Sequence, residues 1–221
     1  MAKLKSFTVN GGPEVLTYEE RLRRSPRWAL MEGSMHFEKG SRVFDTLQRI
    51  TQKLEQLGIP YALAGGLALF LHGYRRFTED VDLLVTRDGL TAIHQRLEGL
   101  GYVPPFEGSK NLRDVESGVK IEFLVQGEYP GDGKPKAVSF PDPAGSAELI
   151  EGIRCLPLPK LIELKLASGM SAAHREKDLV DVQELIRVLS LGADFAGCLD
   201  PSVRPAYIDR WNRAKSTPED S

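Results

Sequence analysis

Two acidic residues at strand spacing are the side chains of this chain best suited to chemistry. Asp80 and Asp82 flank Val81 in the stretch Asp-Val-Asp-Leu-Leu-Val, which is typical of a strand. Alternate side chains of a strand share a face, so both carboxylates project together. Neighbouring carboxylates repel each other, and a hard divalent cation with a preference for oxygen ligands allows both to stay ionised. The pair therefore predicts a site for Mg²⁺ or Mn²⁺.

Glu122 offers a third carboxylate from a second strand. Residues 119–125 alternate strictly, with apolar residues at the odd positions and Glu122 facing the other way. We predict that Asp80, Asp82 and Glu122 bind metal together, and that Glu122 is also a candidate base for an attacking hydroxyl group. An exposed strand acid paired with Lys120 is the alternative role for Glu122.

A glycine pair precedes the two aspartates by about a dozen residues. Gly65 and Gly66 follow a short apolar strand at 61–64, and a turn without side chains lets backbone amides approach phosphate oxygens closely. Arg76 and Thr78, between the glycines and the acids, offer further hydrogen-bond donors to phosphate oxygens. We predict that these four residues bind a nucleoside triphosphate. A tight turn and solvated loop charges are the simpler alternative.

Two charged residues lie on apolar helix faces near the C-terminal end. Lys165 follows Leu161 and Ile162 by four and three positions, and Asp178 falls on the apolar stripe of a helix expected at 175–189. Charges on such faces require a partner or a function. There are two structural alternatives to a catalytic role. Lys165 and Asp178 could form a buried ion pair between the two helices, or Asp178 could stabilise a helix N-terminus.

The periodicity around these residues predicts an α+β fold, in which a small mixed β-sheet is flanked by helices and followed by a helical C-terminal portion. We expect an irregular N-terminal arm at 1–40 with at most one short helix, a catalytic core at 41–150 and a helical portion at 151–221 packed on the core. An irregular surface loop is expected at 126–145. Helices are expected at 43–57, with Ser41 as N-cap, and at 67–71, 88–97, 159–167, 175–189 and 205–213, and strands at 61–64, 80–86, 102–103, 111–115 and 119–125.

The composition is that of an ordinary globular protein and excludes several classes of function. The 221 residues carry a formal net charge of -2, with a pI near 6.1, so long duplex DNA is not expected as the main partner. Cys155 and Cys198 are far apart and predict free thiols. No apolar run suits a signal peptide or a membrane span, which predicts a cytoplasmic protein without a membrane partner.

These motifs resemble a known family. Gly65-Gly66 followed by Asp80-Val-Asp82-Leu-Leu-Val and a later strand acid resembles the signature of the DNA-polymerase-β-like nucleotidyltransferase superfamily. The stretch from Ala64 to Asp80 is similar to the small bacterial branch that includes the toxins of AbiE-type systems. Residues 161–165 and 175–182 resemble the later lysine and aspartate motifs of that branch. The resemblance covers roughly residues 45 to 190.

The resemblance implies transfer of a nucleoside monophosphate from an NTP to an acceptor hydroxyl on RNA such as a tRNA end, on a protein or on a small molecule. It implies that Lys165 contacts the triphosphate and that Asp178 orients the site or the acceptor. It also implies a toxin-antitoxin-like component, with an antitoxin or another protein as partner. The alternatives are a non-catalytic nucleotide-binding or regulatory module of the same fold and a metal-dependent phosphohydrolase.

Overall fold

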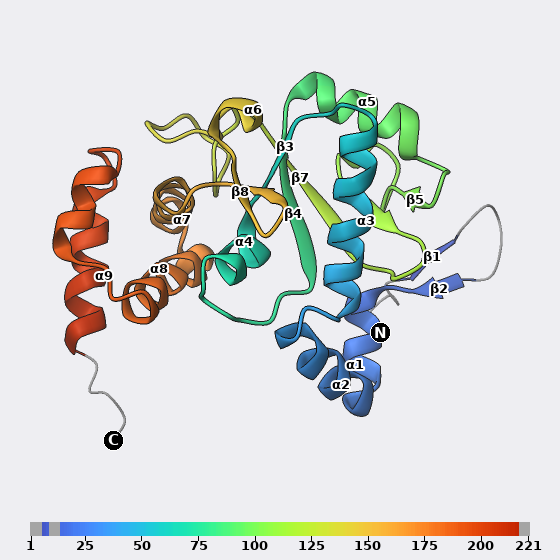
Figure 1. Cartoon of the computed structure of the whole chain (residues 1–221), viewed down its shortest axis with the longest axis horizontal. Coiled ribbons are helices and arrows are strands. Elements are labelled where there is room, and N and C mark those ends of the chain that lie inside the picture. The colour runs from blue at the N-terminus through green and yellow to red at the C-terminus, as the bar shows by residue number, and fades with distance from the viewer. Residues whose placement is uncertain (1–5, 9–13, 217–221) are drawn as a thin grey trace.

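A seven-stranded mixed sheet lies at the centre of the protein, in a computed structural model that describes residues 6–8 and 14–216 (Figure 1). The strand order is β5-β6-β7-β4-β3-β9-β8. The strands are β3 (Tyr61–Leu63), β4 (Asp80–Val85), β5 (Tyr102–Val103), β6 (Leu112–Asp114), β7 (Lys120–Val125), β8 (Glu148–Ile150) and β9 (Ile153–Cys155). The predicted α+β fold with a mixed sheet is confirmed.

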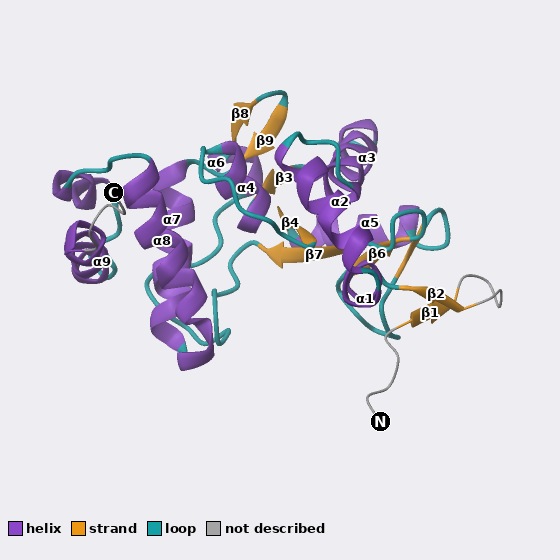
Figure 2. Ribbon diagram, turned by 90° about the horizontal axis from the view of Figure 1, so that it is seen from below, coloured by secondary structure: helices purple, strands orange, loops and turns teal. Residues whose placement is uncertain are grey.

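Helices surround the sheet and dominate the C-terminal part of the chain. They are α1 (Tyr18–Arg24), α2 (Pro26–Phe37), α3 (Arg42–Gln56), α4 (Gly65–Leu71), α5 (Arg87–Leu97), α6 (Pro143–Ser146), α7 (Leu158–Ser171), α8 (Glu176–Val188) and α9 (Arg204–Ser216), with short 3-10 helices at Ala173–Arg175 and Ala193–Cys198. Helices α7, α8 and α9 stack beside one another on one side of the sheet, and α1 lies towards the other end (Figure 2). Within the described ranges, no helix is long and apolar enough to cross a bilayer.

The two central strands form the core and set the position of the acids. β4 and β7 run parallel, and their odd-numbered residues, such as Leu83 and Phe123, are fully buried. Helix α3 crosses this apolar face with a buried stripe, whereas Leu57, just after its last residue, is exposed; the stripe consists of Val43, Phe44, Leu47, Ile50 and Leu54. The even-numbered side chains of β4 and β7 therefore face the opposite way. The alternation predicted from the sequence is present along all of β7 and over the first four residues of β4, after which Leu84 is buried as well.

The N-terminal arm is more regular than its sequence suggests. Helices α1 and α2 fill most of residues 18–37, and a small separate sheet pairs β1 (Ser6–Thr8) with β2 (Glu14–Leu16). The hydroxyls of Thr17 and Ser25 accept hydrogen bonds from backbone amides of the first turns, and Pro26 takes the first position of α2. The expectation of an irregular arm is wrong for these residues, because Thr17 and Ser25 cap two helices and Pro26 begins the second. Residues 1–5 and 9–13 lie outside the described part.

The hairpin β8–β9 is absent from the sequence-based expectation. Both strands are short, and Leu149 is 70% exposed, so no apolar alternation marks them. Pairing of β9 with β3 through Leu63 and Cys155 places them in the main sheet. Residues 151–155 therefore continue the core sheet across the expected boundary at 150/151, and the division into core and helical portion stays a prediction.

His36 ties helix α2 to the core. Its ring is fully buried among the rings of phenylalanines from four positions, and Nε2 lies 3.2 Å from the carbonyl oxygen of Arg76. Nδ1 lies 3.2 Å from Oγ of Ser41. Ser41 precedes α3 as predicted, but its side chain contacts His36 and makes no capping hydrogen bond. The arm is therefore anchored to the loop that carries Arg76.

The buried His36 predicts a loss of stability at mildly acidic pH. Burial lowers the pKa of His36, and the charge of Arg76 lowers it further, against the hydrogen bond to the Arg76 carbonyl. The unfolded state then binds a proton more readily, so this stability is present above a pH of about 6.5 and is lost as the pH falls through the folded pKa. We expect the free energy of unfolding of the wild type to fall by up to about 1.4 kcal/mol per pH unit more than that of His36→Gln. Denaturant unfolding of both proteins from about pH 7.5 to about pH 5.5 measures this difference. The same dependence of unfolding free energy on pH in the wild type and in His36→Gln would contradict the prediction.

Candidate functional site

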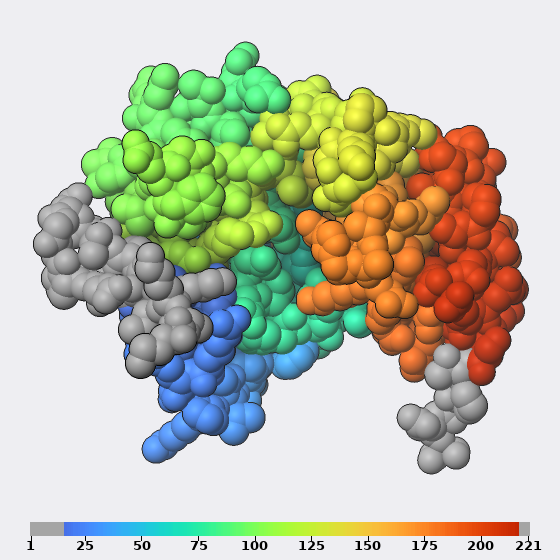
Figure 3. Space-filling view, turned by 180° about the vertical axis from the view of Figure 1, so that it is seen from behind, coloured from blue at the N-terminus to red at the C-terminus, as the bar shows by residue number. Residues whose placement is uncertain are grey.

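A cleft of 880 Å³ opens between the sheet and helices α7 and α8, which is a volume typical of sites for small ligands. A hollow is visible between the yellow-green and orange surfaces (Figure 3). All nine residues proposed from the sequence line this cleft. They are Gly65, Gly66, Arg76, Thr78, Asp80, Asp82, Glu122, Lys165 and Asp178.

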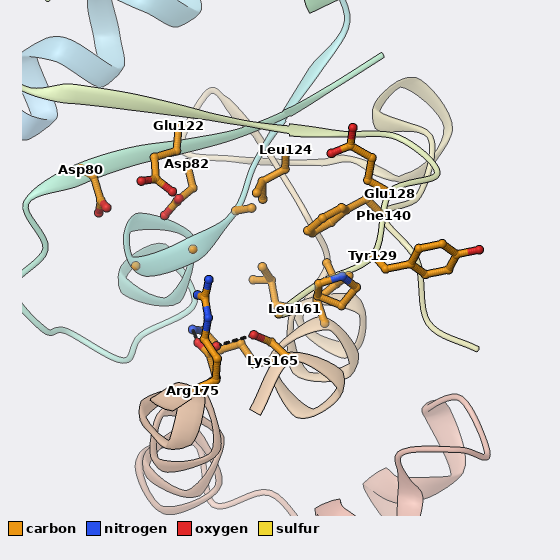
Figure 4. Close-up of a pocket in the computed structure, with 18 of the residues that line it drawn as sticks. Asp80, Asp82, Glu122, Leu124, Glu128, Tyr129, Phe140, Leu161, Lys165 and Arg175 are labelled. Atoms are coloured by element: carbon orange, nitrogen blue, oxygen red, sulfur yellow. Dashed lines mark hydrogen bonds and ion pairs between the residues drawn. The ribbon is translucent and has the colours of Figure 1, made fainter. Parts of the chain in front are cut away.

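Three carboxylates meet on the cleft side of β4 and β7. Asp82 lies directly opposite Glu122 in the parallel register, and Asp80 is two residues earlier on the same face. One ligand atom from each of the three lies within 4.8 Å of the others, and Figure 4 shows Asp82 and Glu122 close together with Asp80 to one side of them. The hydroxyl of Thr78 donates a hydrogen bond of 2.8 Å to Asp80 Oδ1. The clustering of these acids that strand alternation predicts is therefore present.

The acids are electrostatically unfavourable to one another. Burial raises the pKa of Asp82 well above its ordinary value, the charges of Asp80 and Glu122 raise it further, and Lys165 works in the opposite direction. Burial also raises the pKa of Asp80, against the hydrogen bond from Thr78. A cation held between the carboxylates would relieve this repulsion. Three clustered carboxylates are an oxygen donor set that suits a hard divalent ion, so the residues fit Mg²⁺ or Mn²⁺.

Glu122 also forms an ion pair with Lys120, its neighbour but one on β7. This contact is the alternative role that the sequence left open. The two roles are compatible, because a carboxylate has two oxygens with several acceptor positions. Both side chains are about one-third exposed, so the pair with Lys120 contributes little to stability.

The glycine pair packs against the acid cluster. A Cβ atom at Gly65 would lie 1.7 Å from Asp82 Oδ2, and the φ of Gly65 is +60°. A Cβ atom at Gly66 would lie 2.7 Å from Thr78 Oγ1 and 3.3 Å from Nη2 of Arg76. Both positions therefore require glycine. The turn brings its backbone within contact of the acids and of Arg76, which is the close approach that the sequence predicted.

A cluster of alternating charges from α7, α8 and the loop of Arg76 lies beside the glycine turn. Lys165 Nζ is 2.8 Å from Asp178 Oδ1 and 2.7 Å from Asp181 Oδ2. Arg76 Nη2 donates to Asp181 Oδ2 at 3.2 Å. The ion pair of Lys165 with Asp178, which the sequence left open, is present, and both residues line the cleft. Asp181 was missed, although it follows Asp178 by three residues and so shares its helix face.

The ion pairs decide the protonation of this cluster. Burial acts to lower the pKa of Lys165, but the charges of Asp181 and Asp178 outweigh it and the pKa is raised. Burial acts to raise the pKa of Asp178, and Lys165 together with a 2.6 Å hydrogen bond from Ser168 lowers it instead. Lys165 is therefore a fixed positive charge and not a proton donor at neutral pH.

Two further cations line the cleft beside this cluster. Arg175 and Lys177 lie just before and just after the start of α8. Figure 4 shows the Arg175 side chain reaching from the helical side towards Asp82. Neither residue was proposed as a site residue from the sequence, because an exposed charge at a helix start has no distinctive pattern.

The other end of the cleft is apolar. Leu124 from β7, Leu161 from α7 and Phe140 lie close together there, with Tyr129 at the edge (Figure 4). Phe140 and Tyr129 belong to the irregular loop predicted at 126–145. Sequence reasoning did not assign these residues, since an apolar side chain in a loop gives no functional signal.

The loop is fastened to the helical portion. The Asp132 amide donates to Ser171 Oγ at 3.2 Å, and a Cβ atom at Gly131 would lie 2.0 Å from the same hydroxyl. Lys136 donates to the carbonyl of Pro130 and to Asp132. The loop therefore links the core to α7 and encloses the apolar end of the cleft.

The chain is similar to several solved structures. ANT(2'')-Ia, solved in complex with adenylyl-2''-tobramycin, is 17% identical, with a TM-score of 0.50 over 76% of this chain and 97% of that one. A nucleotidyltransferase structure from Thermotoga maritima is 19% identical, with a TM-score of 0.44 over 62% and 92% of the two chains. A nucleotidyltransferase-like protein from Paracoccidioides brasiliensis is also 19% identical, with a TM-score of 0.41 over 64% and 74%.

No model of a known protein family matches the chain, and no curated protein sequence matches it. The likeness to ANT(2'')-Ia therefore concerns the fold. The chain has the fold of a nucleotidyltransferase, which agrees with the superfamily resemblance seen in its motifs.

The close approach of Gly65 to Asp82 predicts that Gly65→Ala destabilises the protein. The new methyl group would collide with the Asp82 carboxylate, and an alanine at a φ of +60° adds strain of about 1–2 kcal/mol. We expect a melting temperature lower by at least about 5 °C in differential scanning calorimetry.

Gly33→Ala is the matched control. Gly33 lies in α2, and nothing lies within 4 Å of the position that a methyl group would take there. Alanine should therefore leave the melting temperature unchanged or raise it by a few degrees, through up to about 1 kcal/mol of helix propensity. Equal melting temperatures for Gly65→Ala and the wild type would show that the glycine is not required.

Proposed function

We propose that this protein transfers a nucleoside monophosphate from an NTP to an acceptor hydroxyl in a reaction that depends on Mg²⁺ or Mn²⁺. The observation that carries the proposal is the cluster of Asp80, Asp82 and Glu122 beside the glycine pair, in a cleft of a nucleotidyltransferase fold. The proposed site residues are those predicted from the sequence, with Asp181 and Arg175 added by the geometry.

The two ends of the cleft suit the two ends of a nucleotide. The glycine turn, Arg76 and Lys165 gather at the end with the acids, where amides and cations can hold phosphate oxygens. The apolar wall of Leu124, Phe140 and Leu161 at the other end suits the face of a base. The cleft thus offers donors for a triphosphate and an apolar surface for a nucleoside.

In the proposed reaction, the acceptor oxygen attacks the α-phosphorus, and the bond from that phosphorus to the bridging oxygen of pyrophosphate breaks. Glu122 accepts the proton of the attacking hydroxyl, and pyrophosphate leaves with the electron pair of the broken bond. A divalent cation bound by the three acids would neutralise charge on the phosphates. Lys165 and Arg76 orient the departing phosphates, and Arg175, just before α8, adds positive charge.

The acceptor belongs to one of three classes. The adenylylated tobramycin bound to ANT(2'')-Ia supports a small molecule, since that protein shares the fold. The motif resemblance to AbiE-type toxins supports an RNA such as a tRNA end, or a protein, together with a toxin-antitoxin-like role and an antitoxin partner. Incubation with labelled NTP and either total RNA, total protein or a panel of hydroxylated small molecules identifies the class by the labelled product.

Two other functions are separated by the same chemistry. A nucleotide-binding or regulatory module would bind NTP without turnover and without dependence on Mg²⁺. A phosphohydrolase would release free phosphate in place of pyrophosphate. The complete set of three acids favours transfer, because a binding module has no need of all three carboxylates.

The double variant Asp80→Asn, Asp82→Asn should lose transfer while keeping its fold. Amides fit the same space but cannot balance the charge of a divalent ion, so several kcal/mol of transition-state stabilisation are lost, which corresponds to a rate lower by about 1000-fold or more. Release of labelled pyrophosphate in the presence of Mg²⁺ and acceptor is the measurement.

The control is Asp88→Asn, a conservative change in the first turn of α5, outside the residues that line the cleft. It should transfer at the wild-type rate. Removal of acidic charge at the site should also raise the melting temperature or leave it unchanged, because burial and mutual repulsion disfavour the two aspartates. Nucleotidyl transfer that persists in the double variant would contradict the proposed role of Asp80 and Asp82.

A further inference from the structure

Asp181 joins cations from two separate parts of the chain. Its side chain on α8 is 3% exposed, and it contacts Lys165 on α7 at 2.7 Å. The Nε atom of Arg76, from the loop between α4 and β4, lies 3.0 Å from the other carboxylate oxygen, Oδ1. One buried carboxylate therefore bridges the loop of the core and the helical portion.

Each cation is held on a second side as well. Arg76 Nη1 donates to the carbonyl of Phe77 at 3.2 Å, and Lys165 also contacts Asp178, which Ser168 fixes by a 2.6 Å hydrogen bond. Long flexible side chains lose considerable conformational entropy when they are held in this way. The cluster thus fixes both cations before any ligand is present, which is the arrangement that preorganises a site.

Both cations lie at the phosphate end of the cleft. The Arg76 guanidinium packs against the glycine turn, where a Cβ atom at Gly66 would come within 3.3 Å of Nη2. Lys165 lines the same cleft as Asp80, Asp82 and Glu122. The two cations therefore flank the position that the proposed function gives to the triphosphate.

We propose that Asp181 is a positioning residue that holds the Lys165 ammonium and the Arg76 guanidinium side by side, so that an NTP triphosphate binds across the junction between the core and the helical portion. The inference rests on the proposed function. Asp181 does not itself contact the nucleotide, because its carboxylate is covered by the two cations and a negative charge would repel the phosphates.

This role makes binding and catalysis respond differently to Asp181→Asn. The neutral amide removes a negative charge that repels the triphosphate, which favours ground-state binding. It also releases the two cations from their fixed positions, which disfavours the transition state. We expect a single-turnover rate of pyrophosphate release lower by about tenfold or more, with the Kd of a non-hydrolysable Mg–NTP analogue within about threefold of the wild type.

The experiment compares the full-length wild type with Asp181→Asn, Asp181→Glu and the control Glu184→Gln, which removes a carboxylate one turn nearer the C-terminus of α8. Glu184 pairs with Arg187 on the surface and lies outside the cleft lining. Calorimetry gives the Kd, rapid quench gives the rate, and mass spectrometry follows acetylation of Lys165 by acetic anhydride at saturating analogue. The rate of Asp181→Glu should lie between those of Asp181→Asn and the wild type. Acetic anhydride should acetylate Lys165 about tenfold faster in Asp181→Asn than in the wild type. Glu184→Gln should match the wild type in all three measurements.

Equal losses of rate and affinity in Asp181→Asn would show that the carboxylate only holds the helices together, and an unchanged rate would show that it positions nothing. Either result overturns the inference. A wild type that binds the analogue but releases no pyrophosphate sinks the proposed transfer alone, because the acetylation of Lys165 in the bound state still shows whether Asp181 fixes it. Unchanged acetylation in Asp181→Asn overturns the inference in that case too.

Discussion

The parallel pairing of β4 with β7 sets Asp82 directly opposite Glu122, and the rest of the site depends on that contact. Two carboxylates side by side on neighbouring strands repel each other, and burial strengthens this repulsion. The register is held by apolar side chains on the other face, such as Leu83 and Phe123, which are fully buried. A slip of one residue would turn Glu122 into the core and expose its apolar neighbours. Core packing therefore stabilises a cluster of like charges that its own electrostatics opposes.

The surroundings of the acids answer this repulsion in two ways. The glycine turn leaves no side chain between the backbone and Asp82, so the acids stay open to a cation and to phosphate oxygens. Lys165 supplies a fixed positive charge from α7, which opposes the rise that burial and the neighbouring acids cause in the pKa of Asp82. Because Lys165 forms ion pairs with Asp178 and Asp181, its ammonium group is held there and does not pair directly with Asp80, Asp82 or Glu122. Lys165 therefore lies near the three carboxylates while leaving their oxygens available to a cation.

Features with a local period were predictable, and features made by distant contacts were not. Alternation in β4 and β7 identified the face that carries Asp82 and Glu122, since a strand repeats every two residues whatever its neighbours are. Asp181 was missed because its importance comes from Arg76, 105 residues away. The hairpin β8–β9 was missed for a related reason, as its place in the sheet comes from pairing with β3 and not from its own pattern. Helices α1 and α2 were missed because their sequences show no sustained apolar period; Pro26, at the first position of α2, marks a helix start.

Arg76 is the point at which three segments of the chain meet. Its carbonyl oxygen lies 3.2 Å from His36 in the arm, its side chain contacts Asp181 on α8, and its guanidinium packs against Gly66 of the core. The loop around Arg76 has no regular structure of its own, so these contacts determine where its charge lies. The arm, whose purpose the sequence did not reveal, thereby fixes the backbone of Arg76, while Asp181 fixes its side chain. A change in the packing of His36 would consequently shift a charge at the phosphate end of the cleft, although His36 does not itself line the cleft.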